Sequence, residues 1–165
     1  MVTPEPRDVT FRFLVADPQN LAIDSDPTEV WSTSPVLQPA NTWTEMFSQL
    51  FQIEPPGKIL WVYFYIKYRI YATTATADVD ERIRARNMGA TYQNISDELA
   101  TANIDVTPIE RITSGHVNPR TGGAGDANFD YLPFEISIDM RTNEVNTGRL
   151  EVSSESFVRV VYEER

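Results

Sequence analysis

The 165-residue chain contains no cysteine, which excludes disulfides, thiolate metal ligands and cysteine nucleophiles. It contains a single histidine, His116, so a multi-histidine metal site is excluded as well. Basic residues are also few, because 14 Lys and Arg stand against 24 Asp and Glu and leave a net charge of −10. Duplex nucleic-acid binders carry a basic stripe, so we expect no direct contact with nucleic acid.

Long hydrophobic runs are missing too. The longest, residues 59–66, falls well short of the roughly 18 residues that a transmembrane helix needs, so we predict no transmembrane segment. Residues 1–8 have neither the basic start nor the apolar stretch of an export signal, and we expect none. The hydrophobic content of 41% suffices for one core, and no repeat or linker divides the chain. We therefore predict a single domain over residues 1–165.

The most informative stretch is Ile59–Tyr71, in which apolar side chains alternate with aromatic and cationic ones. Alternation with period two, rich in β-branched and aromatic residues, predicts a long β-strand. The even positions form the face that we expect to be core: Leu60, Val62, Phe64 and Ile66. Shorter strands are predicted at five further places: Val9–Val15, Ile104–Thr113, Leu132–Arg141, Arg149–Val152 and Phe157–Tyr162.

One amphipathic helix is predicted over Thr42–Ile53. Its apolar residues recur at i, i+3, i+4, i+7 and i+8, and Thr42 with Glu45 fits a capping box. We expect this helix to cover one end or face of a sheet. Asp78–Met88 fits either a second helix or an irregular connection. Residues 17–41 are expected to form a long loop or a set of short edge strands, and the Gly-rich residues 114–128 a mobile loop.

Few residues suggest chemistry. His116 lies in the expected Gly-rich loop and is poorly held for a catalytic base. Glu135 and Asp139 share one strand face, as paired carboxylates of glycosidases can, but Ser137 interrupts the pattern and a solvated outer face is expected. Two acidic groups are expected to be surface charge rather than calcium sites: Asp24, Asp26 and Glu29, and Asp78, Asp80 and Glu81. We predict no catalytic residue, metal site or cofactor, and hence no enzyme.

The odd positions of the long strand form an aromatic row of Trp61, Tyr63, Tyr65 and Tyr71, the candidate interface or binding face. Such rings pack inside a protein, cover a subunit interface, or stack on sugars. The row is longer than one helix can cover, so we expect self-association, at least to a dimer. The predicted fold class is mainly β, an antiparallel β-sandwich or jelly roll with one inserted amphipathic helix.

In its size, acidity, lack of cysteine and density of strands, the whole chain resembles the small single-jelly-roll major capsid proteins of tailless icosahedral viruses that enclose a membrane. It resembles in particular the smaller of the two major capsid proteins in phages of thermophiles and related haloarchaeal viruses. The resemblance implies a structural virion protein, a capsid building block that packs beside a second, larger capsid protein and has no catalytic residue. The alternative is a carbohydrate-binding β-sandwich module that uses the aromatic row.

Overall fold

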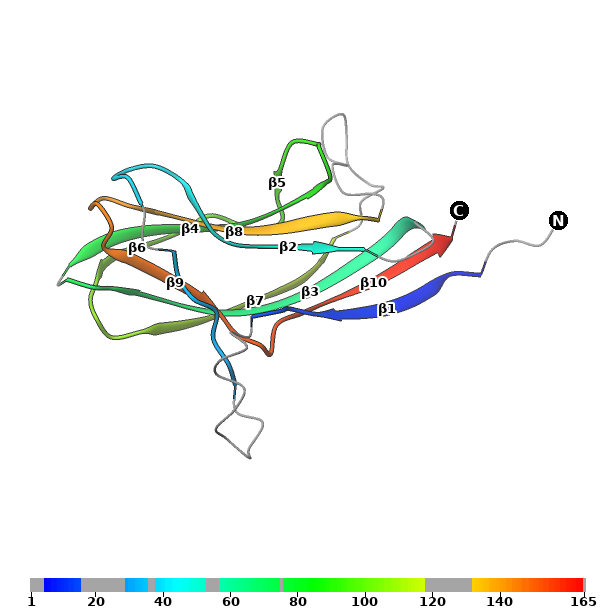
Figure 1. The fold of residues 1–165 in the computed structure, drawn as a ribbon, viewed down its shortest axis with the longest axis horizontal. Helices are drawn as coiled ribbons and strands as arrows, with labels where there is room; N and C mark the ends of the chain where they lie inside the picture. The colour runs from blue at the N-terminus through cyan, green and yellow to red at the C-terminus, as the bar shows by residue number, and fades with distance from the viewer. Residues whose placement is uncertain are drawn as a thin grey trace.

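The structure is a computed structural model that describes residues 5–15, 29–35, 38–52, 57–74, 76–117 and 132–164. These residues form ten strands in two layers (Figure 1). The strands are β1 (Arg7–Arg12), β2 (Thr44–Phe51), β3 (Gly57–Ala72), β4 (Ala77–Asn87), β5 (Gln93–Asn94), β6 (Leu99–Ile104), β7 (Ile109–Val117), β8 (Phe134–Thr142), β9 (Gly148–Val152) and β10 (Phe157–Glu164). Within these ranges there is no helix with the length and hydropathy to cross a membrane.

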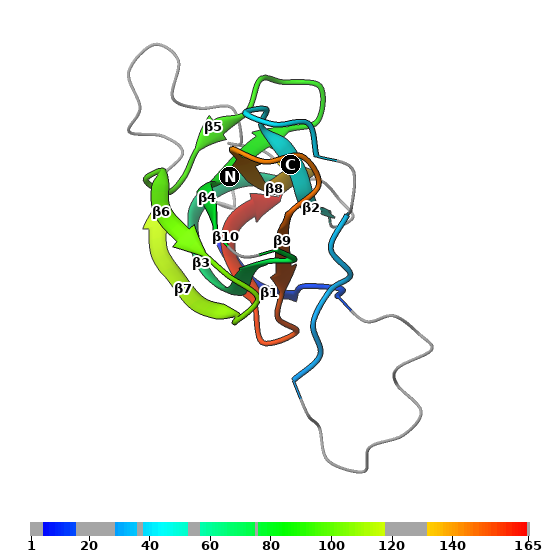
Figure 2. The same ribbon diagram turned by 90° about the vertical axis from the view of Figure 1, so that its left-hand side faces the viewer.

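Each layer is a five-stranded antiparallel sheet. The β3 sheet has the order β1-β10-β3-β7, and β9 pairs with residues 68–72 of β3. The β8 sheet has the order β2-β8-β4-β5, with β6 also paired to β4. A side view along the strands places β6 and β7 at the same flank of the sandwich (Figure 2). The predicted antiparallel sandwich is confirmed.

The strand pairs are nested along the chain. The first strand, β1, pairs with the last, β10, and β2 pairs with β8. Further in, β3 pairs with β7, and β4 pairs with β6. The chain is therefore arranged as one long hairpin that is folded into two layers. In addition, β10 pairs with β3 in one layer and β8 pairs with β4 in the other.

The core lies between the sheets, and the alternation of β3 supplies its centre. Val62, Phe64 and Ile66 are buried as predicted. The prediction for Leu60 is wrong, since Leu60 is only half-buried and Ile59 is fully buried instead. A β-bulge explains the exchange: Trp61 pairs with Val161 and Ile59 with Tyr162, so Leu60 is an extra residue without a partner in β10. The extra residue reverses which positions face inward.

The predicted amphipathic helix over Thr42–Ile53 is wrong, because these residues form strand β2 (Ile53 lies outside the described residues). A bulge between Glu45 and Phe47 lets two adjacent apolar residues sit near the core, which imitates a helical spacing. Phe47 stacks on Phe13 at 5.5 Å between ring centroids, and Phe51 packs on Phe134 at 5.2 Å. Pairing with β8 and this aromatic packing outweigh local helical propensity.

The segment Asp78–Met88 is neither a helix nor an irregular connection, because it forms most of strand β4. Its inward positions include the carboxylate Glu81 among small apolar residues, which hides the alternation in the sequence. The strands predicted near residues 9, 132, 149 and 157 are confirmed as β1, β8, β9 and β10. The strand predicted over Ile104–Thr113 is divided at Pro108 into β6 and β7.

The two predicted loops lie partly outside the described residues. This holds for residues 17–28 and 36–37 of the first loop and for residues 118–128 of the second. Residues 114–117, which were expected to belong to the second loop, end strand β7 instead. His116 is therefore held in a sheet, and the prediction that it lies in a loop is wrong.

Candidate functional site

The outer surface of the β3 sheet carries a continuous set of rings. Trp61 and Tyr63 stack at 6.2 Å with an interplanar angle of 15°, and Tyr65 stacks on Phe157 at 5.5 Å, also at 15°. Tyr63 joins the two pairs through Phe157 at 5.9 Å, and His116 lies 6.2 Å from Trp61. We call these five residues the aromatic face. All of them keep part of their surface in contact with solvent.

Strand register explains how the rings meet. Phe157 of β10 lies opposite Tyr65, and His116 of β7 lies opposite Tyr63, so all four side chains leave the sheet on the same side. The structure thus brings together three of the four residues of the predicted aromatic row, with Phe157 and His116 in addition. The alternation of the last strand places Phe157 outward in the sequence, but only the register shows which residue it faces.

Tyr71 is not part of the aromatic face. Its hydroxyl donates a 2.9 Å hydrogen bond to Glu151, which also binds Arg69 at 2.6 Å. Burial, together with the Glu151 hydrogen bond, raises the pKa of Tyr71. Between Tyr71 and the rings lies Lys67, which pairs with Glu29 at 2.8 Å. This cluster of charges separates Tyr71 from the stacked rings.

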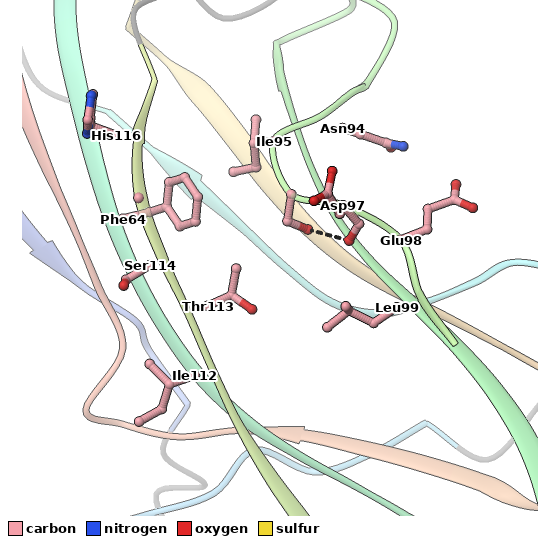
Figure 3. Close-up of a pocket in the computed structure, with 12 residues that line it drawn as sticks. Phe64, Asn94, Ile95, Asp97, Glu98, Leu99, Ile112, Thr113, Ser114 and His116 are labelled. Atoms are coloured by element: carbon pink, nitrogen blue, oxygen red, sulfur yellow. Dashed lines mark hydrogen bonds between the residues drawn. The ribbon is translucent and has the colours of Figure 1, made fainter. Parts of the chain in front are cut away.

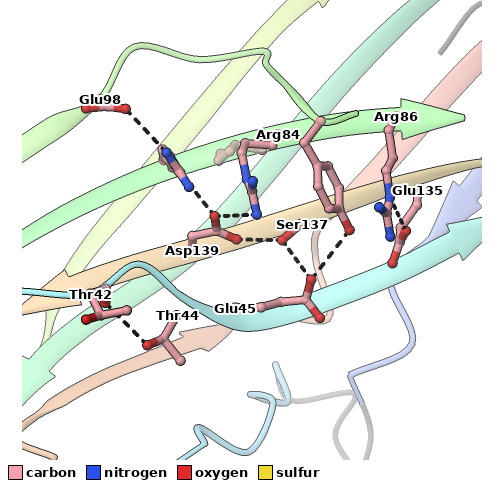
Figure 4. Close-up of polar contacts among 12 residues, drawn as sticks. Thr42, Thr44, Glu45, Arg84, Arg86, Glu98, Glu135, Ser137 and Asp139 are labelled. Carbon is pink, nitrogen blue, oxygen red and sulfur yellow. Dashed lines mark hydrogen bonds and ion pairs between the residues drawn. The ribbon is translucent and has the colours of Figure 1, made fainter. Parts of the chain in front are cut away.

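The opposite surface, on the β8 sheet, holds a buried ion-pair network (Figure 4). Asp139 is 1% exposed and accepts hydrogen bonds from Ser137 Oγ at 2.6 Å and from Arg82 Nε at 3.0 Å. Arg84 Nη2 approaches the same carboxylate at 2.6 Å, and Arg86 pairs with Glu135 at 3.0 Å. The expectation of a solvated outer face is therefore wrong for Asp139 and Ser137.

Two aromatic rings cover this network. The guanidinium of Arg82 lies 4.1 Å from the centre of the Trp43 ring, and those of Arg84 and Arg86 lie 4.2 and 4.1 Å from Tyr92. Burial, followed by the hydrogen bond to Glu135, raises the pKa of Tyr92 to about 12. Stacking of this kind removes water from the arginines and strengthens their ion pairs. The carboxylates of Asp139 and Glu135 are thus held in ion pairs with arginines.

One further carboxylate is buried inside the sandwich. Glu81 is 1% exposed and accepts a 2.5 Å hydrogen bond from Arg111 Nε, which joins β4 to β7 across the two sheets. Burial raises the pKa of Glu81, and Arg111 opposes that effect. The prediction that Glu81 is surface charge is wrong. Its neighbour Asp80 faces outward and pairs with Arg141 at 2.6 Å.

The other acidic group predicted as surface charge falls largely outside the described residues. Asp24 and Asp26 lie there, whereas Glu29 is described and binds Lys67. Burial acts to raise the pKa of Glu29, but hydrogen bonds from Lys67 and Ser153, together with the charges of Lys67 and Arg69, outweigh it and lower that pKa. Glu29 therefore belongs to the ion-pair cluster beside the aromatic face.

A groove of about 760 Å³ opens where the flanks of the two sheets meet (Figure 3). One wall is formed by residues 112–116 of β7, the other by residues 94–99, which connect β5 to β6. Phe64, Ile95, Leu99 and Ile112 supply apolar surface to the groove. No pattern in the sequence predicts this groove, because it is formed by two segments that do not pair with each other.

No family model and no curated protein matches the chain. Among solved structures, the chain matches the Gx strain structure of infectious bursal disease virus with a TM-score of 0.45 and 11% identity, covering 96% of this chain and 36% of that one. It matches a crystal structure of the T13 particle of the same virus with a TM-score of 0.46 and 12% identity, covering 98% and 36%.

A subviral particle of VP2 from this virus matches with a TM-score of 0.42 and 12% identity, over 96% of this chain and 38% of that chain. The chain thus spans little more than a third of the length of these three matched chains. At these scores the likeness carries no conclusion about what the chain does.

Proposed function

We propose that this protein is a structural virion protein, a capsid building block that self-associates and packs beside a second, larger capsid protein. The nested pairing of the strands is the feature of the fold that supports the proposal. Strand β1 pairs with β10, β2 with β8, β3 with β7 and β4 with β6, and nested pairing of this kind is the plan of a jelly roll, the sandwich that viral capsid proteins use. Because lectin domains and cupins share this plan, the fold does not decide the function alone.

The observation that carries the proposal is the aromatic face. Five rings lie side by side on the outer surface of one sheet, where their apolar area meets water. Grouped aromatic side chains on an outer surface are typical of protein interfaces. The rings are already ordered by stacking in the monomer, so association costs little side-chain entropy. A face of this kind fits a subunit that packs against identical or related subunits.

We further propose that the protein has no catalytic activity. Glu135 and Asp139, the pair that most resembles a catalytic dyad, are both engaged by arginines. A catalytic acid or base must contact its substrate, and arginine side chains already contact both carboxylates. The network ties β2, β4 and β8 together and supports a structural role.

A carbohydrate-binding module remains the second candidate, and one observation favours it. Trp61 and Tyr63 lie within 15° of parallel and keep exposed surface, as a platform for a sugar ring requires. The two candidates differ in what covers the rings, which is another protein subunit in one case and a glycan in the other.

Light scattering coupled to size-exclusion chromatography tests the proposal. The unmodified chain is expected to elute as a dimer or larger species, and the double substitution Trp61→Ala, Tyr63→Ala is expected to reduce its mass. Tyr71→Ala is the matched control, since Tyr71 lies on the same strand face but outside the stacked rings. A monomer that binds an insoluble polysaccharide, and loses that binding with Trp61→Ala, would favour the module instead.

A further inference from the structure

One edge of β7 pairs with no other strand among the described residues, and it differs from the other sheet edges in that part of the chain. Unpaired strand edges are templates for pairing with other chains, and proteins usually blunt them by shortness, bulges, proline or lysine. Among the described strands, edge strand β1 has six residues, β2 carries a bulge and β6 pairs with a register shift. Strand β7 has nine residues, pairs with β3 without any shift, and contains neither proline nor lysine. Its inward charge, Arg111, is neutralised by Glu81 within the same subunit.

The groove shows that this edge is accessible. Five consecutive β7 residues, 112–116, line it (Figure 3). Consecutive residues of a strand point to opposite faces of the sheet, so a groove that touches all five borders the backbone edge itself. An added strand would lie here, with Leu99 and Ile95 of the opposite wall beside its inward side chains.

We propose that β7 is the seam on which a second copy of this chain adds its own β7, antiparallel, about a two-fold axis at Thr113. The inference rests on the proposed self-association and goes further by naming the surface. A two-fold axis perpendicular to the sheet keeps outward side chains outward, and directly opposed residues share a face only when the axis passes between two copies of the same residue. Thr113 is the middle residue of Ile109–Val117, so this register pairs all nine residues.

The side chains complement each other in this register. Glu110 lies opposite His116 of the partner subunit, and the two-fold axis produces this pair twice. Each carboxylate then faces an imidazole that can donate a hydrogen bond. Glu110 is exposed and has no hydrogen-bond or ion-pair partner among the described residues, while Arg69, opposite it in β3, is bound to Glu151. Ile112, 59% exposed, lies diagonally across from its own copy and gains apolar cover.

The seam has a consequence for assembly. It joins two β3 sheets into one continuous sheet, with both aromatic faces on the same side. An isologous two-fold contact closes after two copies, so a shell needs at least one further contact. The aromatic face supplies a surface for that second contact. His116 contributes to both surfaces, but Glu110 and Thr113 belong only to the seam and Trp61 and Tyr65 only to the aromatic face, so substitutions at these four residues separate the two contacts.

Cysteine cross-linking tests the seam, because the chain has no cysteine of its own. Glu110→Cys and His116→Cys are prepared as separate proteins, both at exposed positions. Opposed residues in an antiparallel pair have Cα atoms about 4.5–5.5 Å apart, within the range of a disulfide. Two copies of residue 110 would be about 20 Å apart, six residues along the strand. The mixture is expected to form disulfide dimers at least several-fold above either protein alone.

Two further variants sharpen the test. Thr113→Cys is expected to cross-link by itself, and Thr10→Cys on the other edge of the same sheet is the matched control that should not. No cross-link in the mixture, together with light scattering that shows assembly of the unmodified chain, would overturn the seam and leave the proposed function standing. Efficient cross-linking of His116→Cys alone would overturn this register. A monomeric unmodified chain would overturn both.

Discussion

Asp139 shows how a single side chain can hold one sheet surface together. Its carboxylate is excluded from water and joins two strands, since Ser137 lies on its own strand β8 and Arg82 and Arg84 lie on β4. Removing one partner of a buried ion pair leaves the other charges without compensation, which costs more than the pair contributes when intact. The same residue in an exposed strand would contribute almost nothing.

We predict that Asp139→Asn lowers the free energy of unfolding by about 3 kcal/mol, the low end for a broken buried pair because both arginines keep some contact with water. Urea unfolding measures the change. Asp97→Asn, at an exposed position, is the control and should stay within about 0.5 kcal/mol of the unmodified protein. Equal midpoints for the two variants would show that Asp139 is hydrated.

Glu81 predicts a dependence on pH. Burial raises its pKa in the folded state, so the folded protein binds this proton more tightly than the unfolded chain does. Stability from this group is then complete below its unfolded pKa of about 4.5 and is lost as the pH rises through the folded value. Relative to Glu81→Gln, the unmodified protein should therefore lose stability as the pH rises above 4.5.

Urea unfolding of both proteins across this range measures the difference directly. Because each other carboxylate is present in both proteins, its titration cancels in the comparison. A difference that stays constant or grows in favour of the unmodified protein would show that Arg111 overcomes the effect of burial.

At the scale of single elements, regular alternation decides how much the sequence reveals. Strand β3 was predicted over Ile59–Tyr71 because the sequence alternates there with period two, and the structure extends the strand to Gly57–Ala72 with a single interruption. Strand β2 was mistaken for a helix because a bulge places Met46 and Phe47 next to each other near the core. Strand β4 was missed because Glu81 occupies an inward position. In each failure the deciding information lies in a partner strand, which local patterns do not contain.

The bulge in β3 gives a direct test at this scale. We predict that Ile59→Ala lowers the free energy of unfolding by about 3 kcal/mol, since Ile59 is fully buried and leaves a cavity. Its neighbour Leu60, half-buried at the bulge, should cost about 1 kcal/mol when changed to alanine. The reverse order in a urea titration would place Leu60 in the core and contradict the bulge.

For the whole molecule, the sequence predicted the class of fold and an aromatic row but not their arrangement. Strand order, the joining of Phe157 and His116 to the rings, and the groove at β7 all depend on register between distant segments. The outcome is a sandwich with two different outer surfaces. Arginine ion pairs cover one, and half-exposed rings cover the other. This asymmetry fits the proposed assembly subunit, with one surface for stability and another for contact.

Self-association of the unmodified chain is tested by sedimentation velocity, from micromolar to millimolar concentration and at low and high salt. We expect a species of dimer mass or larger, and the fraction of the protein in this species should grow with concentration. Burial of aromatic surface should make this association persist at high salt, since apolar contacts are not screened as ion pairs are. A single monomeric species at every concentration and salt condition would contradict the proposed self-association.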